Sequence, residues 1–184
     1  MPLIRLAALV VASALLAPLA IVPAMAQTPP PAKAQSSDYQ EATALYRQGQ
    51  MDGALERVDA WLKARPKDAR GRFLRGMILT QQKKTSDAIR TYIDLTQDFP
   101  ELPEPYNNLA VIYAGQGEYD KARVLLESAV RAMPSFAAAH ENLGDIYARL
   151  AAVSFEKAIK LDAANKTAPA KLKAVNELLP GGKR

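Results

Sequence analysis

Three prolines recur at one fixed interval in this sequence. Pro66, Pro100 and Pro134 are separated by 34 residues and again by 34. A period of this length is typical of stacked helix–turn–helix units, which bury an apolar face only against their neighbours. Proline lacks the backbone N–H and clashes with the preceding helical turn, so each proline is expected to end the second helix of its unit. The spacing predicts an all-α fold with repeats at 35–68, 69–102 and 103–136.

Small and large residues also coincide when the three repeats are aligned. Small residues let two helices approach closely, and large residues fill the space between them. The aligned small residues are Ala42, Gly76 and Ala110 in the first helix and Ala54, Ala88 and Ala122 in the second. The aligned large residues are Leu45, Leu79 and Tyr113 in the first helix and Val58, Tyr92 and Leu126 in the second.

The third repeat carries the pattern most completely, and it resembles the tetratricopeptide repeat (TPR) family. Its matching residues are Tyr106, Leu109, Ala110, Tyr113, Gly117, Tyr119, Ala122, Leu126, Ala129 and Pro134. The resemblance covers about residues 35–165 and implies a helix–turn–helix solenoid. The first two repeats depart from the family at Asp38, Glu41, Arg72 and Arg75, where it has large apolar residues, and at Trp61, where it has a small one.

A fourth, degenerate repeat at 137–165 begins with His140, Leu143, Gly144 and Tyr147. Its second-helix pattern, Ala151, Phe155 and Ala158, arrives five residues earlier than in the other repeats. The apolar residues keep helical spacing across the junction, which predicts one long helix from about 137 to 162, with a tight hairpin as the alternative. A capping helix at 166–180 would close the repeat domain (37–165), since solenoids need a polar outer cap, and a short basic tail, 181–184, follows.

The amino-terminal segment has the three-part layout of a secretory signal peptide. Arg5 precedes an apolar run over 6–22, and the small-residue triplet at 24–26 predicts cleavage after Ala26, so that 1–26 is the signal peptide. An uncleaved membrane anchor is the alternative. Residues 27–36 contain three consecutive prolines and are expected to form an extended linker. These features predict a periplasmic protein.

The amino-acid composition excludes most of the common kinds of catalytic site. The chain has no cysteine and one histidine, which leaves no thiolate nucleophile and no multi-histidine metal site. We therefore expect no enzyme, no metal and no cofactor. His140 stands at a core position of the fourth repeat and is expected to be a packed side chain.

By resemblance, the first helices of such repeats line an inner groove that grips a segment of a partner protein. The residues that this resemblance places on the groove are Tyr46, Arg47, Arg70, Phe73, Met77, Asn107, Asn108 and Asn142. Phe73 and Met77 lie one helical turn apart and would form an apolar floor, although Phe73 could instead pack between repeats. Asn108 and Asn142 stand where asparagine is common in the family, which favours structural hydrogen bonds.

Charge alternates along the chain. Residues 63–90 carry nine basic and two acidic side chains, 94–145 nine acidic and three basic, and 157–184 seven basic and two acidic. Such a series would orient a partner by charge complementarity.

The preferred function is an exported scaffold that binds protein partners of the cell envelope, and nucleic acid is a poor fit. The alternatives are self-association through the long carboxy-terminal helix and contact of the basic tail with lipid or an envelope polymer. The oligomeric state stays open.

Overall fold

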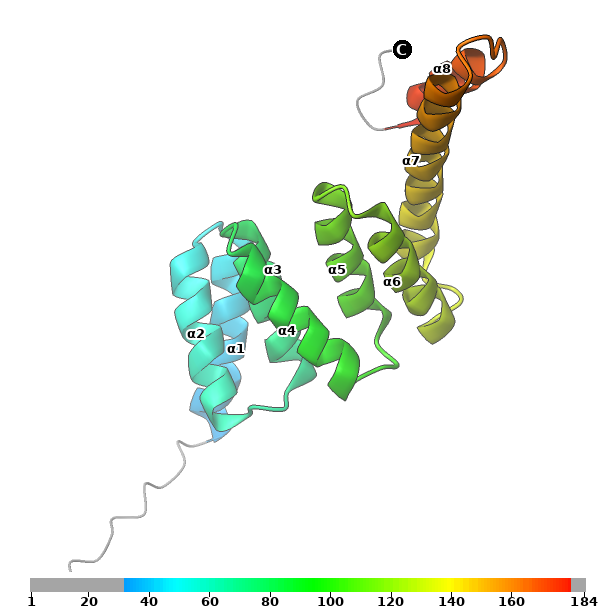
Figure 1. The fold of residues 1–184 in the computed structure, drawn as a ribbon. Helices are drawn as coiled ribbons and strands as arrows, with labels where there is room; N and C mark the ends of the chain where they lie inside the picture. Colours follow the sequence, from blue (N-terminus) through cyan, green and yellow to red (C-terminus); the bar gives the residue numbers. More distant parts are fainter. Residues whose placement is uncertain (1–31, 180–184) are drawn as a thin grey trace, which may run out of the picture. The chain divides into compact units, whose positions relative to one another are not determined.

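The structure, a computed structural model, describes residues 32–179, with side chains from residue 38 onward. The predicted signal peptide and the basic tail lie outside these residues. The described residues form helices without strands, as the period predicts (Figure 1). The helices are α1 (Ala32–Arg47), α2 (Met51–Ala64), α3 (Ala69–Gln81), α4 (Thr85–Asp98), α5 (Pro103–Gly115), α6 (Tyr119–Ala132), α7 (Ala137–Leu161) and α8 (Ala168–Leu178).

Each of the first three repeats seats a large residue of its second helix on a small residue of its first helix. In the second repeat, a Cβ placed at Gly76 would lie 2.6 Å from Cε1 of Tyr92, so the ring lies directly on the glycine. Ala42 and Ala110 are fully buried at the equivalent places in the other two repeats. Burying a large apolar side chain stabilises the fold by about 1.5–3 kcal/mol. These contacts between a large and a small residue lie in three neighbouring apolar clusters along the repeats.

The same backbone turn separates the two helices of each of these repeats. Gly49 and Gly117 have φ angles of +78° and +79°, and Lys83, at the equivalent position of the second repeat, has a φ of +59°. The residue after each turn donates a backbone hydrogen bond of 2.9 Å to a carbonyl five positions earlier. This is the Schellman arrangement, which ends a helix through one residue in the left-handed region.

The boundaries of the repeats follow the sequence period. Helices α3 and α5 begin at Ala69 and Pro103, where the period places the second and third repeats, and α2, α4 and α6 each end two residues before a repeat proline. At the amino-terminal side the structure differs from the expected extended linker, because α1 begins at Ala32 and includes residues 32–36. The prolines end at Pro31, and the alanine, lysine and glutamine that follow favour helix.

The fourth repeat is one continuous helix. Helix α7 runs for 25 residues from Ala137 to Leu161, which confirms the long helix that the spacing predicts. No turn residue ends it at 151, the position equivalent to Gly117. Helix α8 packs against α7, and Asn165 supports its start by accepting hydrogen bonds from the backbone N–H groups of Thr167 (3.1 Å) and Ala168 (2.9 Å).

The charged residues that depart from the family pattern have ionic partners within the fold. Arg72 pairs with Asp98, and Arg75 donates to Asp59 at 2.8 Å and to the hydroxyl of Thr91 at 3.1 Å. These bonds connect α2, α3 and α4 where other repeats have apolar contacts.

Asp38, Glu41 and Trp61, the departures of the first repeat, are accommodated as well. Arg57 lies 3.8 Å from Asp38 and 3.3 Å from Glu41. Trp61 is buried, and its indole N–H donates to Asp68 at 2.6 Å. The ring fits because it lies on Gly71, where an added Cβ would be 2.8 Å from Cδ1 of Trp61.

The positive φ of Lys83 generates the first prediction. A side chain with a Cβ costs about 1–2 kcal/mol in the left-handed region, and glycine avoids this cost at some loss of chain entropy. Lys83→Gly should therefore raise the free energy of unfolding by up to about 1 kcal/mol, as measured by urea denaturation. Lys84→Gly, one residue later at a negative φ, is the matched control and should not stabilise. An equal gain in both variants would contradict the account.

Candidate functional site

Three adjoining pockets follow the first helices of the repeats. The first, of about 200 Å³, lies among α1, α3, α4 and α5. The second, of about 340 Å³, lies among α3, the start of α4 and α5, and the third, of about 130 Å³, lies among α5, α6 and α7. We call this row of pockets the groove. Val111 lines all three and is 52% exposed although its side chain is apolar. The groove is thus a continuous surface centred on α5.

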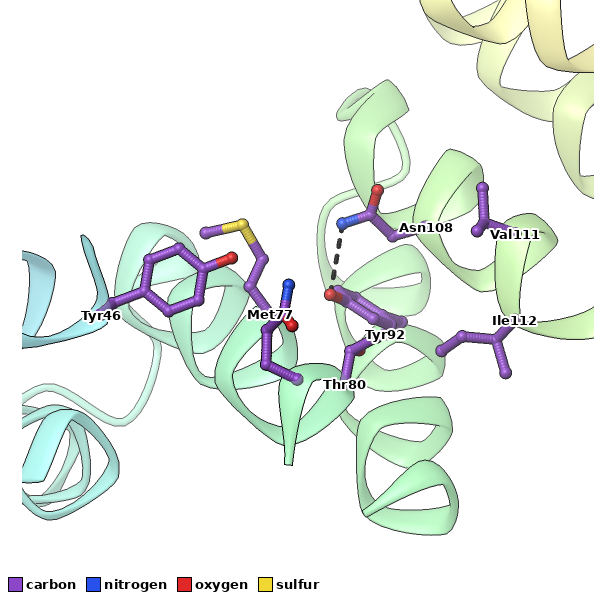
Figure 2. Close-up of a pocket in the computed structure, with 8 residues that line it drawn as sticks. Tyr46, Met77, Thr80, Tyr92, Asn108, Val111 and Ile112 are labelled. Carbon is purple, nitrogen blue, oxygen red and sulfur yellow. Dashed lines mark hydrogen bonds between the residues drawn. The ribbon is translucent and has the colours of Figure 1, made fainter. Parts of the chain in front are cut away.

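The first pocket has apolar walls and a polar base (Figure 2). Tyr46 and Met77 lie side by side on one wall, and Val111 and Ile112 form the other. The hydroxyl of Tyr92 lies between the walls and accepts a hydrogen bond of 3.2 Å from the side-chain amide of Asn108. Its ring remains seated on Gly76 beneath. A ligand segment in this pocket would meet apolar side chains and one fixed polar pair.

Asparagine side chains connect three repeats beneath the groove. Asn142 of α7 donates to the side-chain oxygen of Asn107 at 2.8 Å, and Asn107 donates to Asn108 at 3.3 Å. Asn108 continues the series to Tyr92 of α4. Asn107 is 8% exposed, so its amide depends on these partners. We call these four residues the asparagine chain, and it fixes α5 relative to α4 and α7.

Burial raises the pKa of Tyr92 above its ordinary value of 10.0, and the hydrogen bonds with Asn108 and Thr80 offset this effect only in part. The hydroxyl therefore stays protonated at neutral pH. In the neutral form it keeps a lone pair for Asn108 and a proton that it can donate, so the base of the pocket carries no charge.

The structure brings some of the predicted site residues into the groove. Tyr46, Met77 and Asn108 line the first pocket and Asn142 lines the third, whereas Asn107 is buried below them. These positions agree with the inner face that the family resemblance implies. Whether they contact a partner remains a prediction.

Phe73 lies in a different environment from the expected apolar floor. It lines none of the three pockets, and its ring centroid lies 6.0 Å from that of Tyr92 in the cluster that joins the second and third repeats. Phe73 therefore takes the alternative that the sequence left open, packing between repeats, whereas Met77 lines the first pocket. The Phe73 ring packs between repeats because Arg72 and Arg75, its neighbours on α3, form ion pairs and leave the core.

Two further residues that were predicted for the groove, Arg47 and Arg70, lie outside the pockets. Arg47 is exposed at the end of α1. Arg70 is also exposed, 3.5 Å from Asp68, with its guanidinium 5.6 Å from the ring centroid of Tyr39. His140, expected to pack in the core, is exposed, and its Nε2 lies 2.9 Å from the carbonyl oxygen of Pro134. The packed-histidine expectation is wrong because α7 has no second helix folded over this position.

Sequence reasoning left out Tyr92 and Ile112, which also line the first pocket. Tyr92 belongs to a second helix and was assigned to the core by its alignment with Val58 and Leu126. Only the phenolic oxygen distinguishes it from those residues, and this oxygen is the part that reaches the groove. A polar atom on an aligned core residue is the signal that could have identified it.

The described residues contain no group of three or more His, Cys, Asp or Glu side chains arranged to hold a metal ion. Within the same residues, none of the helices combines the length and apolar character needed to span a membrane. The groove offers surface and hydrogen bonds, which suit binding of a peptide or protein segment.

Comparison with known families agrees with this architecture. Two family models, both described as tetratricopeptide repeat, match residues 39–103 and 79–146. Together they span 39–146, more than half of the 184 residues. The chain belongs to the tetratricopeptide repeat family, and a scaffold for protein–protein interactions is the class of function that this fold supports. No curated protein sequence matches the chain.

Solved structures show the same fold. MamA (residues 41 to the end) from Desulfovibrio magneticus RS-1 is 24% identical, with a TM-score of 0.56 over 78% of this chain and 75% of that one. The first TPR domain of RPAP3, bound to the HSP90 peptide SRMEEVD, is 16% identical, with a TM-score of 0.60 over 66% and 96%. YrrB, described as having an unusual peptide-binding site, is 23% identical, with a TM-score of 0.55 over 59% and 56%.

The asparagine chain generates the second prediction. Asn142→Ala removes the donor to the buried oxygen of Asn107, and an unsatisfied buried polar group costs about 1–3 kcal/mol. We expect the free energy of unfolding to fall by about this amount in urea denaturation. Asn176→Ala, on the exposed side of α8, is the matched control and should change stability little. Equal effects of the two substitutions would mean that the chain of amides does not stabilise the repeats.

Proposed function

We propose that the protein is an exported scaffold of the bacterial cell envelope that binds a segment of a partner protein in the groove. The observation that carries this proposal is the exposed apolar centre of the groove. Val111 projects from α5 into all three pockets, with Met77 and Ile112 beside it. An exposed apolar surface with a polar surround is typical of protein-binding sites.

The shape and polarity of the groove favour a short segment over a large flat surface. The pockets follow one another across α3, α5 and α7, so side chains spaced along a peptide could enter them in turn. The hydrogen-bonding groups at the base, Asn108 and Asn142, are already fixed by the asparagine chain. A preorganised site loses less entropy on binding.

Charges at one end of the groove favour a partner segment with its own charged residues there. Asp145 and Arg149 line the third pocket, and the guanidinium of Arg149 lies 5.7 Å from the ring centroid of Tyr119. Charged groups at the edge of an interface contribute more to specificity and association rate than to affinity. We expect a partner segment with an apolar centre and a polar or charged end.

Export rests on the signal-peptide pattern of residues 1–26. Mass spectrometry of the chain recovered from its host tests it, since cleavage after Ala26 leaves Gln27 as the first residue. An unprocessed chain in the cytoplasmic fraction would contradict export and would leave the groove proposal standing.

Two valines with almost equal exposure provide the test of the groove, which is the third prediction. Val111 is 52% exposed in the groove, and Val124 is 50% exposed on α6, outside it. A photocrosslinking residue at Val111 should give one dominant protein adduct in the native host, identified by mass spectrometry, and the same probe at Val124 should not. An adduct at Val124 alone would move the binding surface away from the groove.

The partner identified in this way allows an affinity measurement. Val111→Glu places a charge at the apolar centre and should weaken binding at least tenfold, or about 1.4 kcal/mol, by isothermal titration calorimetry. Val124→Glu is the matched control and should bind like the native protein. Equal affinities of all three proteins would contradict the proposal.

A further inference from the structure

The first helix of the fourth repeat has the small residue on which a second helix packs in the other repeats, but no second helix covers it. Gly144 stands at the position of Ala42, Gly76 and Ala110, which are buried beneath the second helices of their repeats. Gly144 is exposed, and a Cβ added there would have no atom within 4 Å, whereas one at Gly76 would collide with a ring. The same face of α7 exposes His140 and leaves Tyr147 49% exposed.

The residues that would pack on this small residue are present in the chain but lie on the same helix. Ala151, Phe155 and Ala158 repeat the second-helix pattern of Ala122, Leu126 and Ala129. The three residues of the third repeat are buried, but the three of the fourth are only partly covered, with Lys171 of α8 5.9 Å from the ring centroid of Phe155. Because α7 is continuous, this segment cannot fold back onto Gly144 of its own chain.

A second copy of the protein supplies the missing segment. We propose that two copies pair through α7, with the two helices antiparallel and residues 149–159 of each copy covering residues 140–150 of the other. Placing Phe155 opposite Gly144 puts Ala148 opposite Ala151 and places a two-fold axis between Arg149 and Leu150. The same patch then serves both copies, which is the isologous geometry of a closed dimer. Loss of the turn between two packed elements favours such an exchange.

The charges of α7 agree with the antiparallel orientation. The first half carries Glu141 and Asp145 against Arg149, a net charge of −1 with histidine neutral. The second half carries Lys157 and Lys160 against Glu156, a net charge of +1. Antiparallel pairing places each half beside the opposite half of the other copy, whereas parallel pairing would place like charges together.

The pairing face is separate from the groove. Asn142 and Asp145 line the third pocket from one side of α7, whereas Gly144 and Ala151 lie on the side that this pocket does not use. Dimer formation therefore does not require the groove to bind a partner, and failure of either proposal leaves the other intact.

The decisive experiment compares two substitutions at Gly144 in the full chain, expressed in a bacterium and purified as the host processes it. Light scattering after size exclusion should give twice the monomer mass for the native protein. Gly144→Gln has room in the monomer but would collide with Phe155 of the other copy, so the mass should fall twofold. Gly144→Ala is the matched control and should stay dimeric, because alanine already seats second helices at Ala42 and Ala110.

Circular dichroism and urea denaturation identify misfolding. Because the space around Gly144 is open, both substitutions should leave the fold of the monomer unchanged. A native protein that is monomeric at every concentration tested would overturn the proposal. A dimer whose mass Gly144→Gln leaves unchanged would overturn it as well.

Cysteine crosslinking tests the register, since the natural chain has no cysteine. One copy carrying Ala148→Cys and a differently tagged copy carrying Ala151→Cys should form a disulfide between them under mild oxidation. Val153→Cys in place of Ala151→Cys is the control, because Val153 is 49% exposed but lies on the opposite side of α7. Equal crosslinking of the two pairs would overturn the proposed antiparallel face.

Discussion

The contact between a large side chain of one helix and a small residue of the helix before it determines this structure. Where Tyr92 lies on Gly76, the two helices of a repeat come close enough to exclude water and to stack on the next repeat. The contact needs two conditions, a small residue in the first helix and a turn that returns the chain. The first three repeats meet both conditions, and the fourth meets only the first.

The groove is a consequence of the same contacts. Seating the second helices on one side leaves the other side of α3 and α5 to form pockets, in which Met77 and Val111 stay accessible. The asparagine chain then holds neighbouring repeats in one arrangement through hydrogen bonds that start at Asn142. Tyr92 takes part in both features, because its ring belongs to the core and its hydroxyl to the groove.

Local periodicity is why the repeat fold could be predicted from the sequence. Prolines at a constant spacing and small residues in register require no knowledge of distant contacts, and the missing turn in α7 could be recognised by counting residues. The positive φ of Lys83 could not be predicted from its residue type, although its alignment with Gly49 and Gly117 marks the position.

The site was harder to predict because its details depend on pairs of residues from different helices. Phe73 packs against Tyr92 because Arg72 and Arg75 find carboxylates on other helices, which no local pattern indicates. His140 is exposed because α7 has no second helix that folds over this position. In each case, the side chain's position is decided by the presence or absence of a partner on another helix.

Restoring the missing turn tests the central claim most directly. A copy of residues 115–119 inserted between Ala148 and Arg149 gives the fourth repeat the same spacing as the third. We predict that α7 then divides into two helices, and that NMR detects an intramolecular nuclear Overhauser effect between Gly144 and the ring of the natural Phe155. A continuous helix without this contact would contradict the claim that the turn and the small residue together determine the fold.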